Sequence, residues 1–167
     1  MKLNEFDGKH VYLVGGSSGI GLAIAKKLVM AGAHILLISR TQATLEEATK
    51  ELELLRNNNL QKIRFQCLDV SEHQPTQNIL NEQVISFGIP DVLINCAGRA
   101  IPEHHDKISY QQFDQTLKIN LYGCHNTVSA LLPHMKENGG LIVNTSSLAG
   151  IIGVFGYTDY CASKFAL

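Results

Sequence analysis

The stretch that decides the fold is VGGSSGIG, from Val14 to Gly21, in which four glycines and two serines occupy eight residues. It follows the apolar run HVYLV at 10–14 and precedes LAIAKKLVMAG, whose apolar residues have helical spacing. Glycine loses more conformational freedom on folding than any other residue, so a glycine-rich link between a strand and a helix needs a physical reason. The reason we infer is a sharp turn that brings the backbone close to a ligand.

Short β-branched runs alternate along the chain with segments of helical periodicity. The expected strands are 10–14, 34–39, 62–68, 91–95 and 141–146, and the expected helices are 19–31, 44–56, 75–87, 109–135 and one from Tyr157 onward. The second helix has two candidate N-caps, Thr41 and Thr44. The strands read as continuous apolar runs, which is typical of a sheet covered on both faces. The alternation predicts an α/β fold: a doubly wound, Rossmann-type parallel sheet with helices on both faces.

The composition describes an ordinary domain spanning 1–167. Of the 167 residues 45% are hydrophobic, and the net charge of −1 gives no sign of a basic surface for nucleic acid. The cysteines Cys67, Cys96, Cys124 and Cys161 form no CxxC, so we expect reduced thiols rather than disulfides or a metal site. No signal peptide or membrane-spanning run is visible. We expect a cytoplasmic protein and leave open peripheral contact with a membrane.

Ligands of doubly wound sheets bind at the carboxyl ends of the strands, where the glycine-rich stretch lies. A helix N-terminus carries unpaired N–H groups and a partial positive charge, which suit a phosphate. We assign Gly15 to the turn, Gly19 to the approach of the phosphate and Gly21 to the contact between helix and strand. The spacing Gly-x3-Gly-x-Gly differs from the usual Gly-x-Gly-x-x-Gly fingerprint, so the position after the first strand carries the interpretation. The remaining residues expected in this loop are Ser17, Ser18 and Ile20.

The end of the second expected strand bears on the type of cofactor. Sites for NAD carry an acidic residue there, which takes the ribose hydroxyls. This sequence instead reads Ile38-Ser39-Arg40-Thr41, without a carboxylate. A guanidinium suits a 2′-phosphate, so we predict NADP(H) rather than NAD(H) at Ser39 and Arg40. The alternative is that Arg40 is a solvated residue at the start of a helix.

The segment Tyr157-Thr-Asp-Tyr160-Cys-Ala-Ser-Lys164 pairs a proton donor with a cation. Tyr160 and Lys164 have i, i+4 spacing and are neighbours on a helix. A cation beside a phenol favours the phenolate, so Tyr160 could give or take a proton. Alone, such a pair would be an ordinary one on a helix surface. Ser146 and Ser147 end the fifth expected strand at the same edge, and either hydroxyl could hydrogen-bond a substrate carbonyl.

Together these segments resemble the short-chain dehydrogenase/reductase superfamily over essentially the whole chain. Its Thr-Gly-x3-Gly-x-Gly loop corresponds to 14–21, with Val14 in place of the usual threonine. Its Asn-Asn-Ala-Gly motif appears as NCAG, with Asn95, Cys96, Ala97 and Gly98. Its adenine-contacting aspartate corresponds to Asp69, which Val70 follows. Its catalytic residues correspond to Asn120, Ser147, Tyr160 and Lys164.

The resemblance implies a role for each of these residues. Tyr160 would protonate a carbonyl oxygen during reduction, and Lys164 would favour its phenolate and hold the nicotinamide ribose. Ser147 would orient the carbonyl, and Asn120 would hold a water that links Lys164 to solvent. The cofactor contacts implied are Gly15, Ser17, Ser18, Gly19, Ile20, Gly21, Ser39, Arg40, Asp69, Val70, Asn95, Ala97, Gly98, Tyr160 and Lys164. The resemblance also implies a small-molecule ketone or alcohol substrate and a homo-oligomer, either a dimer or a tetramer.

The run between Ser147 and Tyr160 bears on the substrate. Its apolar residues would suit a long acyl chain, although they could equally form a core-packing loop. Residues 153–166, with GGSSGIG and NCAG, resemble the 3-ketodihydrosphingosine reductase branch, which implies NADPH-dependent reduction of a lipid-like 3-keto substrate. The alternatives are a 3-oxoacyl-(acyl carrier protein) reductase and a non-catalytic module that senses the dinucleotide. The apolar residues of the run are Leu148, Ile151, Ile152, Val154 and Phe155.

The last expected helix is cut in mid-run at Leu167. Members of the resembled superfamily continue with further strands and a mobile substrate lid. We therefore expect the C-terminal part of the domain, including that lid, to be missing from this sequence.

Overall fold

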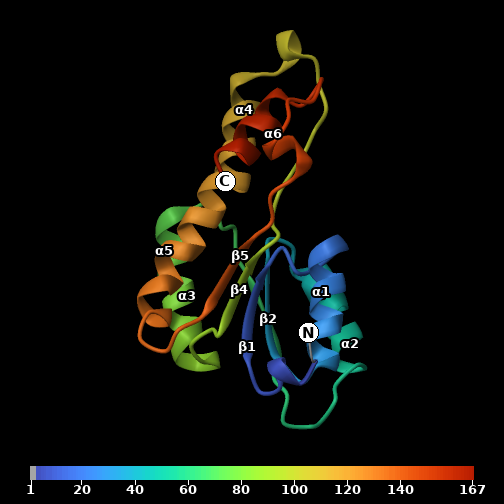
Figure 1. Ribbon diagram of the computed structural model, residues 1–167, viewed down its shortest axis with the longest axis vertical. Coiled ribbons are helices and arrows are strands. Elements are labelled where there is room, and N and C mark those ends of the chain that lie inside the picture. The colour runs from blue at the N-terminus through green and yellow to red at the C-terminus, as the bar shows by residue number, and fades with distance from the viewer. Residues whose placement is uncertain (1–2) are drawn as a thin grey trace.

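Five parallel strands form one sheet in the order β3-β2-β1-β4-β5 (Figure 1). This is a computed structural model, and it describes residues 3–167. The order reverses between β1 and β4, so the loops after these two strands diverge and open a crevice at their carboxyl ends. The strands are β1 (His10–Val14), β2 (His34–Ser39), β3 (Ile63–Cys67), β4 (Val92–Asn95) and β5 (Leu141–Asn144).

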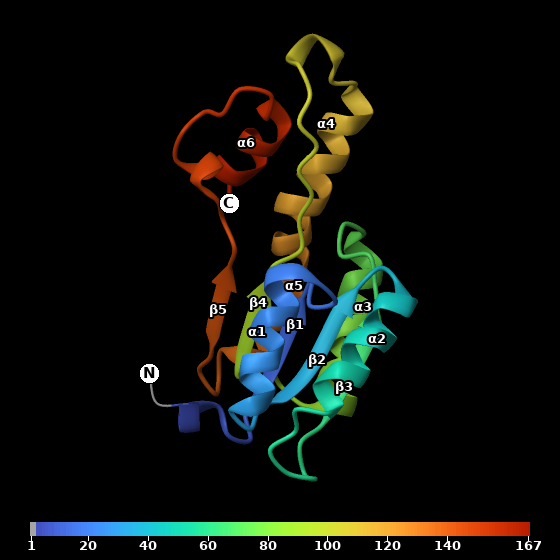
Figure 2. The same ribbon diagram turned by 90° about the vertical axis from the view of Figure 1, so that its right-hand side faces the viewer.

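Helices cover both faces of the sheet, which confirms the doubly wound fold. Buried side chains of α1 and α2 pack on one face, and those of α3 and α5 pack on the other. Both α4 and α6 lie beyond the carboxyl ends of the strands, next to each other (Figures 1 and 2). The helices are α1 (Gly19–Met30), α2 (Gln42–Glu53), α3 (His73–Phe87), α4 (Tyr110–Leu117), α5 (Gly123–Met135) and α6 (Thr158–Phe165).

Alternate residues of β1 and β2 enter opposite cores. Val11 and Leu13 belong to the core under α1 and α2, whereas Tyr12 and Val14 belong to the core under α3 and α5. Burying each such side chain contributes about 1.5–3 kcal/mol. Because both faces are covered, the strand reads as an unbroken apolar run rather than an alternating one.

The edge strand β5 departs from this expectation. Leu141 and Val143 pair in register with Val92 and Ile94 of β4, so they face the same side as α1. They remain 53% and 38% exposed, because within residues 3–167 no helix extends over this part of the sheet. Full burial was therefore wrong for β5, and correct for β1, β2 and β4.

The structure identifies the N-cap of α2 and shows that one of the expected helices is interrupted. The N-cap of α2 is Thr41, and the Thr44 hydroxyl donates to the Thr41 carbonyl at 3.0 Å. The long helix expected over 109–135 consists of α4 and α5 joined by a π-helical segment, Lys118–Tyr122. The N–H of Gly123 donates to the Lys118 carbonyl across five residues, which defines this wider turn.

Two further observations concern the surface. The loop after β4 contacts the segment before α6, since the N–H of Glu103 donates to the Gly156 carbonyl at 2.9 Å and the ring of His104 meets that of Phe155 edge-on at 5.2 Å. His104 thus has a packing role. Among residues 3–167, none of the helices combines the length and the apolar character needed to cross a membrane.

Two histidine rings contact each other at the end of the sheet opposite the crevice. The rings of His10 and His34 are 4.7 Å apart, and the His10 ring also meets Phe87 edge-on. The buried Nε2 of His10 has no hydrogen-bond partner among the described residues, whereas Nδ1 of His34 accepts from the Lys62 N–H at 2.9 Å. Burial lowers the pKa of both histidines below their ordinary value of 6.5. His34 and Lys62 lower the pKa of His10 further, Lys62 lowers that of His34, and Asp91 opposes both shifts.

This pair predicts a loss of stability in mild acid. A histidine whose pKa is lowered by folding stabilises the fold while it is neutral, and this contribution is lost as the pH falls below the unfolded value near 6.5. Between about pH 7.5 and about pH 5.5, we expect the thermal midpoint to fall, as followed by circular dichroism.

The double variant His10→Phe/His34→Asn is the control, since it keeps the ring contact and an acceptor for the Lys62 N–H but removes both protonation sites. We expect it to lose less stability over the same pH range. An equal loss in both proteins would mean that other groups cause the acid sensitivity.

Candidate active site

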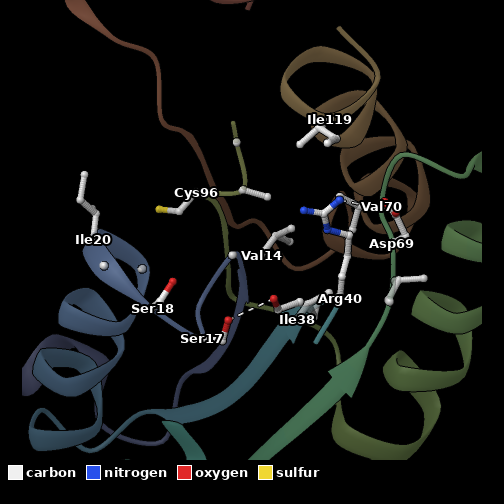
Figure 3. A pocket seen from close by; sticks show the side chains of 17 residues that line it. Val14, Ser17, Ser18, Ile20, Ile38, Arg40, Asp69, Val70, Cys96 and Ile119 are labelled. Atoms are coloured by element: carbon white, nitrogen blue, oxygen red, sulfur yellow. Dashed lines mark hydrogen bonds and ion pairs between the residues drawn. The ribbon is translucent and has the colours of Figure 1, made fainter. Parts of the chain in front are cut away.

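A pocket of about 360 Å³ opens at the carboxyl ends of β1 to β4 (Figure 3). It lies where the strand order reverses, which is where doubly wound sheets bind their ligands. Residues from five separate stretches of chain line it, and Ile119 is contributed by the π-helical segment. The lining consists of Val14, Gly15, Ser17, Ser18, Gly19, Ile20, Gly21, Ile38, Ser39, Arg40, Leu68, Asp69, Val70, Cys96, Ala97, Gly98 and Ile119.

Most residues expected to contact a dinucleotide are brought together here. The exceptions are Asn95, Tyr160 and Lys164, which do not line the pocket. Val14, Ile38 and Leu68 were missed because they read as ordinary ends of buried strands. Ile119 carries no signal in the sequence, since only the packing of the π-helical segment brings it over the pocket.

The glycine-rich loop brings two backbones into contact. Gly15 has a φ of +78°, and a Cβ there would lie 2.6 Å from the Ala97 amide nitrogen. A Cβ on Gly21 would lie 2.2 Å from the Gly15 carbonyl oxygen. Gly19 has a φ of +52° with open space around it. Gly15 and Gly21 thus occupy the turn and the close contact with the helix that were assigned to them, whereas the approach of a phosphate to Gly19 stays a prediction.

The first turn of α1 presents its backbone donors to the pocket. Its N-cap, Ser18, is extended and its side chain makes no capping hydrogen bond. The hydroxyl of Ser17 instead donates to that of Ser39 at 3.1 Å, which ties the loop to the end of β2 (Figure 3). Because side chains of the loop leave the first N–H groups of α1 uncapped, this end of the pocket suits an anion.

Arg40 projects from the end of β2 into the pocket, on the side of Asp69 and Val70 (Figure 3). Its Nη1 is 4.0 Å from the Asp69 carboxylate, and both side chains are about half exposed, at 55% and 43%. Such a long, solvated ion pair contributes little to stability. Asp69 also accepts a hydrogen bond from the Ser71 N–H at 3.0 Å, so its carboxylate is fixed while the guanidinium stays available to a ligand.

Asn95 lies behind the pocket and joins three elements. Its Oδ1 accepts from the Thr127 hydroxyl of α5 at 2.8 Å, and its Nδ2 donates to Oδ1 of Asn144 in β5 at 2.9 Å. The side chain is buried. It therefore shapes the pocket indirectly, by fixing the end of β4 ahead of Cys96 and Ala97.

Lys164 reaches from α6 back to the sheet. Its Nζ donates to the Thr145 carbonyl at 2.7 Å and lies 5.9 Å from the centre of the Tyr160 ring. The residue is only 6% exposed, and within residues 3–167 no carboxylate forms an ion pair with it. A buried ammonium has three hydrogens to donate, so this one has capacity for further acceptors.

Gly98 connects Lys164 and Asn120 with the pocket. A methyl group on Gly98 would lie 3.3 Å from Oδ1 of Asn120 and 3.9 Å from Nζ of Lys164. Since Gly98 itself lines the pocket, two of the four catalytic residues expected from the sequence, Asn120 and Lys164, stand directly beside it.

The two serines after β5 make different hydrogen bonds. Ser146 donates its hydroxyl to the Lys164 carbonyl at 3.3 Å. Ser147 accepts from the Ala149 N–H at 3.2 Å, and no described residue accepts its hydroxyl hydrogen. Only the Ser147 hydroxyl therefore remains free to donate to a ligand, a distinction that periodicity does not make.

Asn120 sits in the π-helical segment and is fully buried. Its Nδ2 donates to the Arg99 carbonyl and to the Ser163 hydroxyl, both at 2.9 Å, and its Oδ1 accepts from the Arg99 N–H at 2.8 Å. Both amide hydrogens are used, so one lone pair of Oδ1 is what remains for a water. The segment is wider than an α-helix, a feature that often marks functional sites and that the sequence does not reveal.

Comparison with known proteins agrees with this geometry. The sequence model of the short chain dehydrogenase family matches residues 9–167. The 3-ketodihydrosphingosine reductase of Bos taurus is 37% identical over 96% of this chain and 49% of its own length. The fatty acyl-CoA reductase of Acinetobacter baylyi is 38% identical over 96% of this chain and 54% of its own length.

A solved structure shares the fold as a whole. The NAD⁺-bound xylitol dehydrogenase superposes with a TM-score of 0.90 at 29% identity, covering 97% of this chain and 62% of that one. The chain spans about half the length of the curated relatives it matches. With the family model matching residues 9–167, the chain belongs to the short chain dehydrogenase family.

Proposed function

We propose that this chain carries the dinucleotide site and the catalytic residues of an NADP(H)-dependent carbonyl reductase in which Tyr160 is the general acid. One observation carries the proposal: the buried ammonium of Lys164 lies beside the Tyr160 ring and next to Gly98 of the pocket. A non-catalytic sensing module would have no use for a proton donor paired with a cation, so this arrangement favours an enzyme.

A nicotinamide dinucleotide fits the residues present. The uncapped first turn of α1 and the open space at Gly19 suit its phosphates. Lys164 has hydrogens left for ribose hydroxyls, and Val14, Val70 and Ile119 offer apolar contacts for a base. Such a cofactor, when bound, supplies the hydride for the carbonyl carbon.

The chain's own residues would supply the proton and hold the substrate. Ser147 donates its free hydroxyl hydrogen to the carbonyl oxygen and orients it. Tyr160 transfers its phenolic proton to the same oxygen, which completes the alcohol. The adjacent Lys164 stabilises the phenolate that remains. A water on the remaining lone pair of Asn120 returns the proton from solvent through Lys164.

The preference for NADP(H) is assigned to Arg40. Its guanidinium enters the pocket from the end of β2, where a ribose 2′-phosphate would lie, and its ion pair with Asp69 is long and solvated. A phosphate can therefore replace this weak pair with charge-assisted hydrogen bonds.

A long-chain keto compound is the substrate class we propose. Beside the catalytic residues, Leu148, Ile151 and Phe155 are 65%, 74% and 85% exposed, which is unusual for large apolar side chains in one short segment. An alkyl chain would cover them. The names of the relatives from Bos taurus and Danio rerio point to 3-ketodihydrosphingosine, and the name of the Acinetobacter relative points to a fatty acyl thioester. We also propose a cytoplasmic protein with peripheral access to membranes, where a lipid-like substrate would be found.

Replacing Tyr160 with phenylalanine tests the general acid. Removal of the phenolic proton should lower kcat by about 10²–10⁴-fold, measured from the absorbance of NADPH. The affinity for NADPH, measured by fluorescence titration, should stay near that of the unchanged protein. Tyr157→Phe is the matched control, because the Tyr157 ring lies 5.8 Å from that of Tyr160 and loses the same hydroxyl. Undiminished turnover in Tyr160→Phe would refute the role of Tyr160.

Arg40→Asp tests the cofactor preference. We expect affinity for NADPH to fall about tenfold to a hundredfold, because a charge-assisted contact is lost and a repulsive carboxylate is introduced. Affinity for NADH should change little or improve. Arg64→Asp makes the same change of charge on the exposed part of β3, away from the pocket, and should leave both affinities unchanged. An unaltered ratio of the two affinities in Arg40→Asp would contradict the assignment.

A substrate panel separates the candidate reactions. With NADPH in excess, we expect turnover of 3-ketodihydrosphingosine to exceed that of acetoacetyl thioesters and of fatty acyl-CoA. Higher kcat/KM with acetoacetyl thioesters would favour a 3-oxoacyl reductase instead. Higher kcat/KM with fatty acyl-CoA would favour reduction of a thioester.

A further inference from the structure

The residue immediately before Tyr160 is a completely buried carboxylate. Asp159 has no exposed surface, and it lies in the first turn of α6. Its Oδ1 accepts from the Tyr160 N–H at 2.8 Å, and its Oδ2 accepts from the Thr116 hydroxyl of α4 at 2.7 Å. One carboxylate thus links the backbone of Tyr160 to a neighbouring helix.

Such a group is expensive to bury unless it is well compensated. Removing a carboxylate from water costs several kcal/mol after relaxation, and within residues 3–167 no cation forms an ion pair with Asp159. The compensation comes from its two hydrogen bonds and from the positive end of α6. A side chain this costly needs a purpose beyond packing.

Asp159 performs the capping function that the N-cap residue leaves undone. Tyr157 is the N-cap of α6 and its side chain makes no capping hydrogen bond. The Tyr160 N–H belongs to the first turn, so it has no partner within the helix. Asp159 satisfies this donor and, through Thr116, fixes it relative to α4.

A second buried chain of hydrogen bonds holds the other polar group of the Tyr160 backbone. The Ser163 hydroxyl donates to the Tyr160 carbonyl at 2.7 Å and accepts from Nδ2 of Asn120 at 2.9 Å. Ser163 and Asn120 are both fully buried. The N–H and the carbonyl of Tyr160 are therefore tied by separate side chains to α4 and to the π-helical segment that follows it.

We infer that Asp159 is a positioning residue, which together with Thr116 fixes the backbone of Tyr160 and so aims its phenol at the substrate carbonyl. This inference rests on the proposed function, because it assumes that Tyr160 is the acid. Correct placement of a reacting group can account for a large part of the lowering of the activation barrier by an enzyme. A displacement of about 1 Å can reduce the rate about a hundredfold. Asp159 itself contacts neither the substrate nor the cofactor.

Counting the donors and acceptors in this link identifies a substitution of Asp159 that should preserve both of its hydrogen bonds. Asparagine at 159 keeps an oxygen that can accept from the Tyr160 N–H. Its amide can donate to the Thr116 oxygen, while the Thr116 hydroxyl donates to the Gln112 carbonyl, which already lies 3.0 Å away. Asp159→Ala removes both carboxylate oxygens. The Tyr160 N–H then loses its acceptor, and the Thr116 hydroxyl loses its bond to residue 159.

Steady-state kinetics of the variants test the inference. We expect Asp159→Ala to lower kcat about a hundredfold, with KM for NADPH nearly unchanged, and Asp159→Asn to recover most of the lost kcat. Thr116→Val is nearly isosteric, removes the bond between Asp159 and α4 together with the local Thr116 bond to the Gln112 carbonyl, and leaves the bond from Asp159 to the Tyr160 N–H, so its kcat should lie between those of the two Asp159 variants. Asp114→Asn is the control, since it neutralises a carboxylate of α4 that pairs with Lys118 at the surface, and it should behave like the unchanged protein.

Hydrogen exchange provides a readout that does not depend on activity. In peptides covering 157–165, backbone amides should exchange faster in Asp159→Ala and Thr116→Val than in the unchanged protein or in Asp159→Asn. Wild-type kcat in Asp159→Ala, or an Asp159→Asn variant as slow as Asp159→Ala, would overturn the inference. Failure of the proposed function is distinguishable, because the unchanged protein would then reduce no ketone at all, whereas the exchange pattern would still report on the link.

Discussion

The contact between the Gly15 backbone and the Ala97 amide is the constraint on which the rest of the site depends. It exists because β1 and β4 are adjacent in the sheet, although the stretch from Gly15 to Asp91 separates them in the chain. Parallel strands need such a long crossover connection, because a short loop cannot join them. With no Cβ at Gly15, the loop after β1 turns against the loop after β4, and the first turn of α1 faces the crevice between them. The same close approach places Gly98 beside Lys164 and Asn120.

The proposed catalytic residues are held by a different set of interactions from those that form the pocket. The Lys164 ammonium donates a hydrogen bond to the Thr145 carbonyl, just after β5. The Asn120 side chain hydrogen-bonds the backbone of Arg99, after β4. Asp159 accepts a hydrogen bond from the Tyr160 N–H, and Ser163 donates one to the Tyr160 carbonyl. The pocket is built on strand ends, whereas the proposed proton donor, Tyr160, lies on a helix beyond the sheet. The bonds of Lys164 and Asn120 to the loops after β5 and β4 join the two parts.

Much of the fold follows from the sequence because its determinants are local. Continuous apolar runs mark β1, β2 and β4, helical periodicity marks the helices between them, and the position of the glycines marks the turn into α1. The dinucleotide loop, Ser39, Arg40, Asp69 and the Tyr160–Lys164 pair are recognisable for the same reason: each is a short pattern next to a strand end or on one helix face. The parallel order then brings the separate strand ends to one edge of the sheet.

Other features were decided only by the tertiary structure. The free hydroxyl of Ser147, in contrast to the donated hydroxyl of Ser146, depends on the backbone of Lys164 in another element. The structural role of Asn95 depends on Thr127 and Asn144, and the link from Asp159 depends on Thr116. The partners in these links lie 18 to 49 residues apart and in different elements, so no local pattern encodes them. The sequence by itself determined which elements form and which strand ends meet at the crevice. The packing of helices beyond the sheet decided which polar groups are free to react, because a hydrogen bond already made inside the protein is not available to a ligand.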